Sequence, residues 1–103
     1  CRYCMMACPY KARSFVHEPV SGQKPDVPRG KGCVESCTLC VHRIDRDQLP
    51  ACVEACAAAG HKAILFGDLN DPASEISQRI AAVASRQLRA DLNLGTGVRY
   101  AGL

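Results

Sequence analysis

Cysteine constrains this chain more than any other feature, because eight of its 103 residues are cysteines. A density this high indicates disulfide bridges, bound metal or redox chemistry, and the spacing distinguishes among them. Seven of the cysteines fall into two runs, one from residue 1 to residue 8 and the other from residue 37 to residue 56. The eighth, Cys33, stands outside both runs. The two runs are therefore the strongest candidates for a functional site.

The first run consists of Cys1, Cys4 and Cys8 followed by Pro9, which gives the pattern C-x2-C-x3-C-P. It equals the bacterial ferredoxin pattern C-x2-C-x2-C-x3-C-P without its first cysteine, which we expect upstream of residue 1. Two-residue gaps bring successive sulfurs to the same side of one tight turn, as the corners of an iron-sulfur cube require. Proline disfavours helical geometry in the residue before it, so Cys8 should lie beyond that turn. We therefore expect Cys8 to bind a different cluster.

The second run follows the same logic with an insertion of eleven residues, in the pattern C-x2-C-x11-C-x3-C. Cys37 and Cys40 would supply two corners of a cube, and Cys52 would return for the third after the insertion. Cys56 is then the outlying cysteine, equivalent to Cys8 of the first run. All seven cysteines are accordingly predicted ligands of [4Fe-4S] clusters, and two such runs in one chain predict pseudo-twofold ferredoxin modules.

Three other uses of the cysteines compete with this interpretation. An even number of cysteines permits disulfides, but closely spaced C-x2-C pairs make poor bridges for a fold rich in loops. A zinc site would also use such pairs, although the C-x3-C extensions are superfluous for four tetrahedral ligands. A structural zinc module that binds a partner is the main alternative. A thiol-disulfide enzyme would need an alternation of strand and helix that the sequence lacks.

The remaining candidate side chains have an ordinary interpretation beside the functional one. Cys33 is predicted to be a buried thiol, a spare ligand or a group that faces a partner, with a non-ligand role favoured. His42 lies two positions after Cys40 and would tune a cluster, or it is a simple loop residue like His17 and His61. Three basic residues near the first run would raise a cluster's potential by favouring its reduced form, or are plain solvated charge: Arg2, Lys11 and Arg13.

The composition predicts a thin apolar core. The chain has no tryptophan, two phenylalanines and three tyrosines, and a domain of this size buries only about two-thirds of its unfolded surface. A net charge of +3 with scattered lysines and arginines gives no stripe suited to nucleic acid. No apolar run approaches the roughly 18 residues that a membrane helix needs. Bound clusters are thus expected to organise the fold more than apolar packing does.

The sequence predicts an α+β, ferredoxin-like module followed by a docking helix and an extended tail. The ferredoxin-type region should span residues 1–71, with a long loop at 17–32, rich in proline and glycine, between its two motifs. The second region, residues 72–103, should begin with a helix over 72–88 that Asp71 caps. Shorter elements are expected as follows: a helical turn at 2–7, a strand at 13–16, a helix at 49–59 that Gly60 ends, a strand at 63–66 and an edge strand at 98–100.

These motifs resemble those of a known family, the four-cluster electron-transfer subunits of molybdopterin oxidoreductases, such as the dimethyl sulfoxide, polysulfide and formate-linked enzymes. The resemblance covers most of the chain and rests on four segments: Cys-Pro-Tyr at 8–10, Cys-Thr-Leu-Cys-Val-His-Arg-Ile at 37–44, Pro-Ala-Cys at 50–52 with Cys56, and Phe-Gly-Asp-Leu-Asn-Asp-Pro at 66–72. Gly-Cys at 32–33 and Thr-Gly-Val-Arg-Tyr at 96–100 look most like the DsrO type, which belongs to the membrane complex that serves dissimilatory sulfite reduction.

This resemblance implies that clusters are shared between motifs. A full chain of the family has four motifs, of which these two resemble the third and fourth, so the chain is expected to be the C-terminal part of a longer subunit. The implied ligand groups, each completed by cysteines outside these residues, are Cys1 with Cys4, Cys37 with Cys40 and Cys52, Cys8 alone for the cluster of the second motif, and Cys56 alone for that of the first.

The resemblance further implies electron relay without a catalytic site in this chain. The partners would be a quinone-linked membrane subunit and a catalytic or cytochrome subunit of the same complex. The loop at 17–32 and the glycine-rich tail would be the contacts with them. The complex would belong to dissimilatory sulfur metabolism, and the subunit would be periplasmic and membrane-associated, with an export signal outside these residues.

Overall fold

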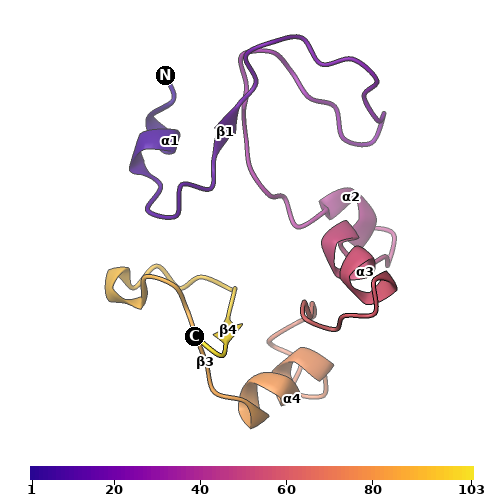
Figure 1. Ribbon diagram of the computed structural model, residues 1–103, viewed down its shortest axis with the longest axis vertical. Helices are drawn as coiled ribbons and strands as arrows, with labels where there is room; N and C mark the ends of the chain where they lie inside the picture. The colour runs from indigo at the N-terminus through magenta and orange to yellow at the C-terminus, as the bar shows by residue number, and fades with distance from the viewer. The chain divides into compact units, whose positions relative to one another are not determined.

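A computed structural model describes residues 1–103, and Figure 1 shows the chain coloured from its N-terminus to its C-terminus. The chain forms two compact units, Cys1–Glu54 and Ala55–Leu103. The regular elements are short and mixed: α1 (Tyr3–Ala7), β1 (Ser14–Phe15), β2 (Val34–Glu35), α2 (Val41–Ile44), α3 (Ala51–Ala58), α4 (Glu75–Ala82), β3 (Ser85–Arg86), the 3-10 helix η1 (Ala90–Leu92) and β4 (Tyr100–Ala101). This mixture agrees with an α+β class, while the ferredoxin-like grouping and the division at residue 71 stay predictions. None of the helices is long and apolar enough to cross a bilayer.

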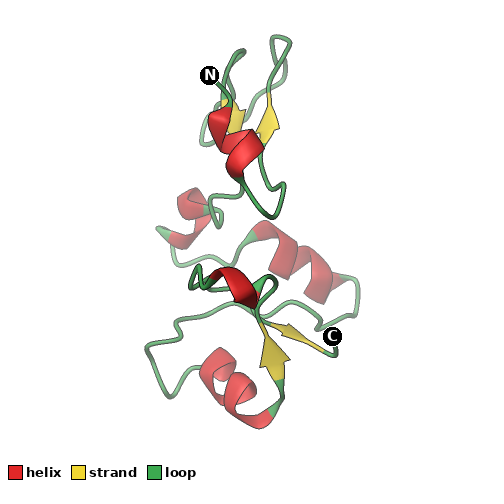
Figure 2. Ribbon diagram, turned by 90° about the vertical axis from the view of Figure 1, so that its left-hand side faces the viewer, coloured by secondary structure: helices red, strands yellow, loops and turns green.

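The strands β1 and β2 pair antiparallel and form the hairpin of the first unit, drawn in yellow in Figure 2. Ser14 lies opposite Glu35 in this pairing. Two backbone bonds extend the pairing beyond the strands: the Val16 N–H donates to the Cys33 carbonyl at 3.0 Å, and the Gly32 N–H donates to the Val16 carbonyl at 2.8 Å. The predicted first strand is therefore present, and the predicted long loop is the connection of this hairpin.

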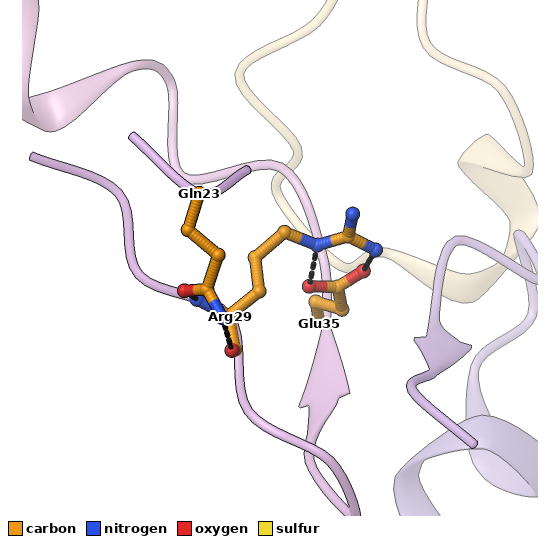
Figure 3. Close-up of polar contacts among 3 residues, drawn as sticks. All are labelled: Gln23, Arg29 and Glu35. Carbon is orange, nitrogen blue, oxygen red and sulfur yellow. Dashed lines mark hydrogen bonds and ion pairs between the residues drawn. The ribbon is translucent and has the colours of Figure 1, made fainter. Parts of the chain in front are cut away.

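Side chains, and not regular structure, hold the long loop at 17–32 in place. The Gln23 amide nitrogen donates to the carbonyls of Val20 at 3.0 Å and Arg29 at 2.8 Å, and Oε1 accepts from the Arg29 backbone N–H at 2.7 Å. The Arg29 guanidinium in turn donates twice to the Glu35 carboxylate, at 2.9 and 2.6 Å, as Figure 3 shows. The planar guanidinium matches the carboxylate in this bidentate geometry. Because Glu35 lies on β2, the loop is tied to the second strand of its own hairpin.

A second bidentate pair connects the middle of this loop to the segment that follows α2. The Arg46 guanidinium donates to the Asp26 carboxylate at 3.0 and 3.2 Å. The hydrogen bond from Arg46 holds the pKa of Asp26 below its ordinary value of 3.8, and the hydrogen bond from Arg29 holds the pKa of Glu35 below its ordinary value of 4.5. Both carboxylates therefore stay charged, and both pairs stay formed, well into the acid range.

We expect strong acid to release this loop. Because the folded pKa values of Glu35 and Asp26 are lowered, their contribution to stability is complete above the unfolded values and is lost as the pH falls through the lowered ones. Hydrogen exchange at the Arg29 backbone amide, corrected for its intrinsic rate, should show protection at about pH 7 and about pH 5 that decreases below about pH 4 and is lost once the pH has passed the lowered pKa values. Glu35→Gln, which keeps the shape without the charge, should already lower protection at neutral pH. Protection that stays constant down to about pH 2 would contradict this expectation.

The helix α4 begins three residues later than the sequence predicts. The predicted N-cap is Asp71, but Ser74 takes that position, and its hydroxyl accepts from the Ser77 backbone N–H at 3.3 Å. Asp71 instead closes a turn, since its Oδ1 accepts from the Ala73 N–H at 2.9 Å. Short polar side chains satisfy free N–H groups in turns as well as at helix starts. The prediction was therefore wrong about which of two capping residues, three positions apart, begins the helix.

The helix α4 also ends earlier than predicted, at Ala82 instead of residue 88. Val83 is extended, with φ −123° and ψ 128°, and the chain continues into β3, which pairs antiparallel with β4. This pairing within the second unit competes with helix propensity over the same residues and prevails. The predicted edge strand near the C-terminus is present with its start shifted by two residues, whereas the segment at 63–66 forms no strand.

Apolar packing contributes little to either unit. The buried side chains are Val16 and Val53, with exposed fractions of 6% and 8%, and Pro50, and none of them is fully enclosed. Fourteen larger apolar side chains are exposed, among them Met6 and Leu39. The predicted thin core is confirmed. Local hydrogen bonds and ion pairs therefore make up most of the contacts described within each unit.

Candidate metal centres

The first cysteine run lies on and around α1. Cys1 precedes the helix and Cys4 lies within it, and both side chains are exposed. The helix ends at Cys8, whose backbone is extended (φ −66°, ψ 117°) and whose N–H donates to the Cys4 carbonyl at 3.1 Å. The predicted effect of Pro9 is thus confirmed, because Cys8 leaves the helical geometry that holds Cys4.

The backbone that follows Cys8 surrounds its sulfur with N–H groups. Hydrogen bonds from the backbone N–H groups of Ala12 and Tyr10 lower the pKa of the Cys8 thiol from its ordinary 9.0. The positive charge of Arg13 and the Lys11 N–H add to this effect, while slight desolvation opposes it. A lowered pKa favours the thiolate, which is the form of cysteine that binds metal. This segment therefore favours the thiolate form of Cys8.

In the second run, two consecutive residues just before α2 adopt a left-handed backbone. Leu39 and Cys40 have φ values of 55° and 52°, and the Leu39 N–H donates to Cys37 Sγ at 3.3 Å. A left-handed conformation costs a non-glycine residue about 1–3 kcal/mol, and such residues cluster at functional sites. The Ala51 N–H donates to Cys40 Sγ at 3.5 Å. The Cys37 and Cys40 sulfurs thus each accept a backbone N–H, as the Cys8 sulfur does.

The other two cysteines of the second run lie four residues apart on α3. Cys52 is exposed, and Cys56 is partly buried. The Cys56 thiol donates to the His61 carbonyl at 3.3 Å, past Gly60, whose φ of +82° ends the helix as the sequence predicts. Cys56 must give up this S–H contact in order to act as a thiolate ligand. In this respect it differs from Cys8, its counterpart in the first run.

The insertion between Cys40 and Cys52 is closed by one side chain. The Arg43 guanidinium donates from Nε to the Leu49 carbonyl at 2.8 Å and forms an ion pair with Glu54. The sequence around Arg43 gives no signal that distinguishes it from a solvent-exposed charged residue, because Leu49 and Glu54 lie several residues downstream.

Two further side chains near the runs stay without an assigned role. Cys33 is exposed and free, at the end of the long loop, and a Cβ placed on Gly30 would come within 3.1 Å of its sulfur. His42, on α2, has a buried Nδ1 with no hydrogen-bond partner.

An open hollow of about 480 Å³ lies beside Cys37. Its lining residues include Lys11 and Arg13, which follow Cys8 in the chain, and Glu35.

The sulfur donors fit an iron-sulfur cluster in their chemistry, but they do not complete a site by themselves. All eight cysteines are free, and no three metal-binding side chains come close enough together to hold a metal ion. In particular, the structure places the Cys40 sulfur against the backbone of Ala51, the residue before Cys52, yet does not gather Cys37, Cys40 and Cys52 into one site. The roles of the seven predicted ligands therefore stay predictions.

Known proteins are similar to this chain along much of its length. It is 48% identical to the Hdr-like menaquinol oxidoreductase iron-sulfur subunit 1 of Archaeoglobus fulgidus, over all of this chain and 42% of that protein. It is 45% identical to the iron-sulfur subunit of a putative dimethyl sulfoxide reductase of Halobacterium salinarum, over 85% of this chain and 34% of the relative. It is 42% identical to a tetrathionate reductase subunit of Salmonella typhimurium, over 75% of this chain and 25% of the relative.

These relatives define what the chain resembles. The chain spans less than half the length of each of the three, and no protein-family model matches it. The broad prediction that its relatives are iron-sulfur subunits of oxidoreductases is confirmed by the names of the Archaeoglobus and Halobacterium proteins. The narrower likeness to the DsrO type stays a prediction.

Proposed function

We propose that this chain is part of an electron-transfer subunit whose two cysteine runs bind [4Fe-4S] clusters. The observation that carries the proposal is the C-x2-C-x3-C-P run, in which Cys8 leaves the helix that holds Cys4. Backbone N–H groups also lower the pKa of the Cys8 thiol, which agrees with a ligand role. A [4Fe-4S] cluster, when bound, takes up and releases one electron at a time, at a potential that hydrogen bonds to sulfur help to set. The same N–H groups that favour the thiolate would therefore also tune the potential. The iron-sulfur relatives support this assignment.

The proposed role of the chain's residues is to bind and orient, without bond chemistry of their own. The proposed ligands are Cys1, Cys4, Cys8, Cys37, Cys40, Cys52 and Cys56. Their thiolates are the soft ligands that iron-sulfur clusters take in proteins. We assign no residue as a general acid, base or nucleophile, so catalysis would lie in a partner subunit.

We further propose that the chain is the C-terminal part of a subunit with four motifs, in which cysteines outside these residues complete each cluster. One comparison supports this arrangement, since the chain corresponds to 42% of its Archaeoglobus relative. In this arrangement Cys8 and Cys56 would each leave their own run and complete a cluster of another motif.

The proposed setting is a membrane-associated redox complex of the DsrO-containing kind, linked to dissimilatory sulfur metabolism. The partners would be a quinone-linked membrane subunit and a catalytic or cytochrome subunit, and the location would be periplasmic. The relative named for menaquinol oxidation and the one named for tetrathionate reduction support this setting. The loop at 17–32 and the tail from residue 90 to residue 103 are the proposed contacts with these partners.

The test is the metal content of the full-length native protein, purified without oxygen. Four cubes require about sixteen irons and as many labile sulfides per chain. We expect that content, a brown colour, and an electron paramagnetic resonance signal that appears when the protein is reduced. Stoichiometric zinc in a colourless protein would instead favour the structural zinc module, and a protein without any metal would refute both.

A further inference from the structure

The insertion between Cys40 and Cys52 must bring two proposed ligands together across a longer stretch of chain than the ferredoxin pattern does. In that pattern two residues separate successive ligands, whereas here eleven residues separate Cys40 from the next cysteine. Only a fixed path through the insertion can return Cys52 to the side of Cys40. A flexible segment would leave the third thiolate free to move away.

One side chain fixes that path at both of its ends. Arg43 lies three residues after Cys40, on α2, and its guanidinium donates to the Leu49 carbonyl at 2.8 Å and pairs with Glu54, two residues after Cys52. Its backbone carbonyl accepts from two N–H groups further along the insertion, both at 3.0 Å. Arg43 therefore lies near the beginning of the segment that separates the two ligands, and it contacts both the interior of that segment and the helix that carries Cys52.

The closed insertion brings the start of α3 to the Cys40 sulfur. Ala51, the first residue of α3, donates its N–H to Cys40 Sγ at 3.5 Å, so the start of the helix that carries Cys52 lies against the Cys40 thiol. The Arg43 side chain is only 24% exposed, whereas the Glu54 side chain is 63% exposed. Because solvent screens an ion pair with an exposed partner, the hydrogen bond from Arg43 to the Leu49 carbonyl should matter more than the pairing with Glu54.

We propose that Arg43 is a positioning residue: it holds the eleven-residue insertion closed so that Cys40 and Cys52 meet the same cluster. This inference rests on the proposed function and concerns how the chain brings the ligands together. Two donors are required, since one N–H group must reach the Leu49 carbonyl while another meets Glu54. A guanidinium supplies both from different nitrogens in a rigid plane, whereas a lysine ammonium carries all its donors on one nitrogen and cannot reach two separated acceptors in the same way.

The experiment compares four variants of the full-length native protein, purified without oxygen, by iron content and by electron paramagnetic resonance. Arg43→Gln should lose one cluster's iron, about four of about sixteen, or convert that cluster to a three-iron form with its own signal in the oxidised protein. Arg43→Lys, which restores the charge but only one of the contacts, should lose less. Glu54→Gln should keep nearly all of the iron. Arg46→Gln is the matched control, because it removes an equal charge from the same insertion and breaks only the contact with Asp26.

The possible outcomes distinguish a failure of this inference from a failure of the proposed function. If the unmodified protein holds its clusters and Arg43→Gln keeps every iron, the positioning role is wrong and the electron-relay function stands. A lowered potential with full iron content would assign Arg43 to charge tuning and would also overturn the inference. Loss of all clusters together would indicate general misfolding, and it too would count against a local role. An unmodified protein without iron would refute the function and the inference together.

Discussion

Chelating the iron from the full-length native protein is expected to remove the protected structure of residues 1–103. The structure buries only Val16, Pro50 and Val53, so almost no apolar core would hold the chain once the clusters are gone. Hydrogen exchange should show protection in the loaded protein, and after anaerobic chelation most amides of this region should exchange within about tenfold of their unprotected rates. Adding ferrous iron and sulfide should restore the protection.

Zinc, and the peptides of the full-length protein outside residues 1–103, provide the controls for this experiment. Zinc added to the iron-free protein should restore less protection than iron and sulfide, because one tetrahedral ion cannot replace a cube shared between motifs. Peptides outside residues 1–103 serve as an internal reference for general damage. Full protection in the iron-free protein would contradict the expectation and would mean that the hydrogen bonds of this region suffice.

The expectation follows from the size of the elements. The helices α1 and α2 have five and four residues, and β1 to β4 have two each. Helices below about 12 residues are marginal in water without tertiary packing, because the first turn is unfavourable to form. The ion pairs that hold the long loop, Arg29 with Glu35 and Arg46 with Asp26, are open to solvent and therefore contribute little each. Metal binding is the remaining source of stability that the cysteines offer.

The parts of the fold that could be predicted from sequence are those that a single residue decides. Pro9 takes Cys8 out of the helix, and Gly60 ends α3 in the left-handed region that glycine adopts readily. The start of α4 could not be predicted in this way, because Asp71 and Ser74 are both good caps and the structure uses both, one for a turn and one for the helix. Local preference alone does not rank two adequate caps.

In the candidate site, too, the sequence predicts some features and not others. The spacing predicts which cysteines are candidate ligands, since it fixes how sulfurs are presented along the chain. It does not predict Arg43, whose contacts with Leu49 and Glu54 depend on how the insertion folds back. Nor does it predict the left-handed backbone of Leu39 and Cys40, because neither residue type favours that conformation. Long-range contacts and strained backbone are the features that a spacing pattern omits.

Replacing single cysteines should produce the second large effect, a loss of iron that depends on which cysteine is changed. In the full-length native protein, Cys40→Ser and Cys8→Ser should each lose one cluster, about four of about sixteen irons, or leave a three-iron cluster. The Cys8 variant should lose a different cluster from the Cys40 variant, because the two are proposed to serve different motifs. Electron paramagnetic resonance of the partly reduced proteins would distinguish which signal disappears.

Cys33→Ser is the matched control for these variants, since it changes an exposed cysteine four positions before Cys37 and outside both runs. It should keep every iron, because neither motif uses that position. If it loses as much iron as Cys40→Ser, Cys33 is a ligand and the assignment of the second run must change. If Cys8→Ser and Cys40→Ser abolish the same signal, the two runs serve one cluster, and the proposed assignment of Cys8 and Cys40 to different clusters is refuted.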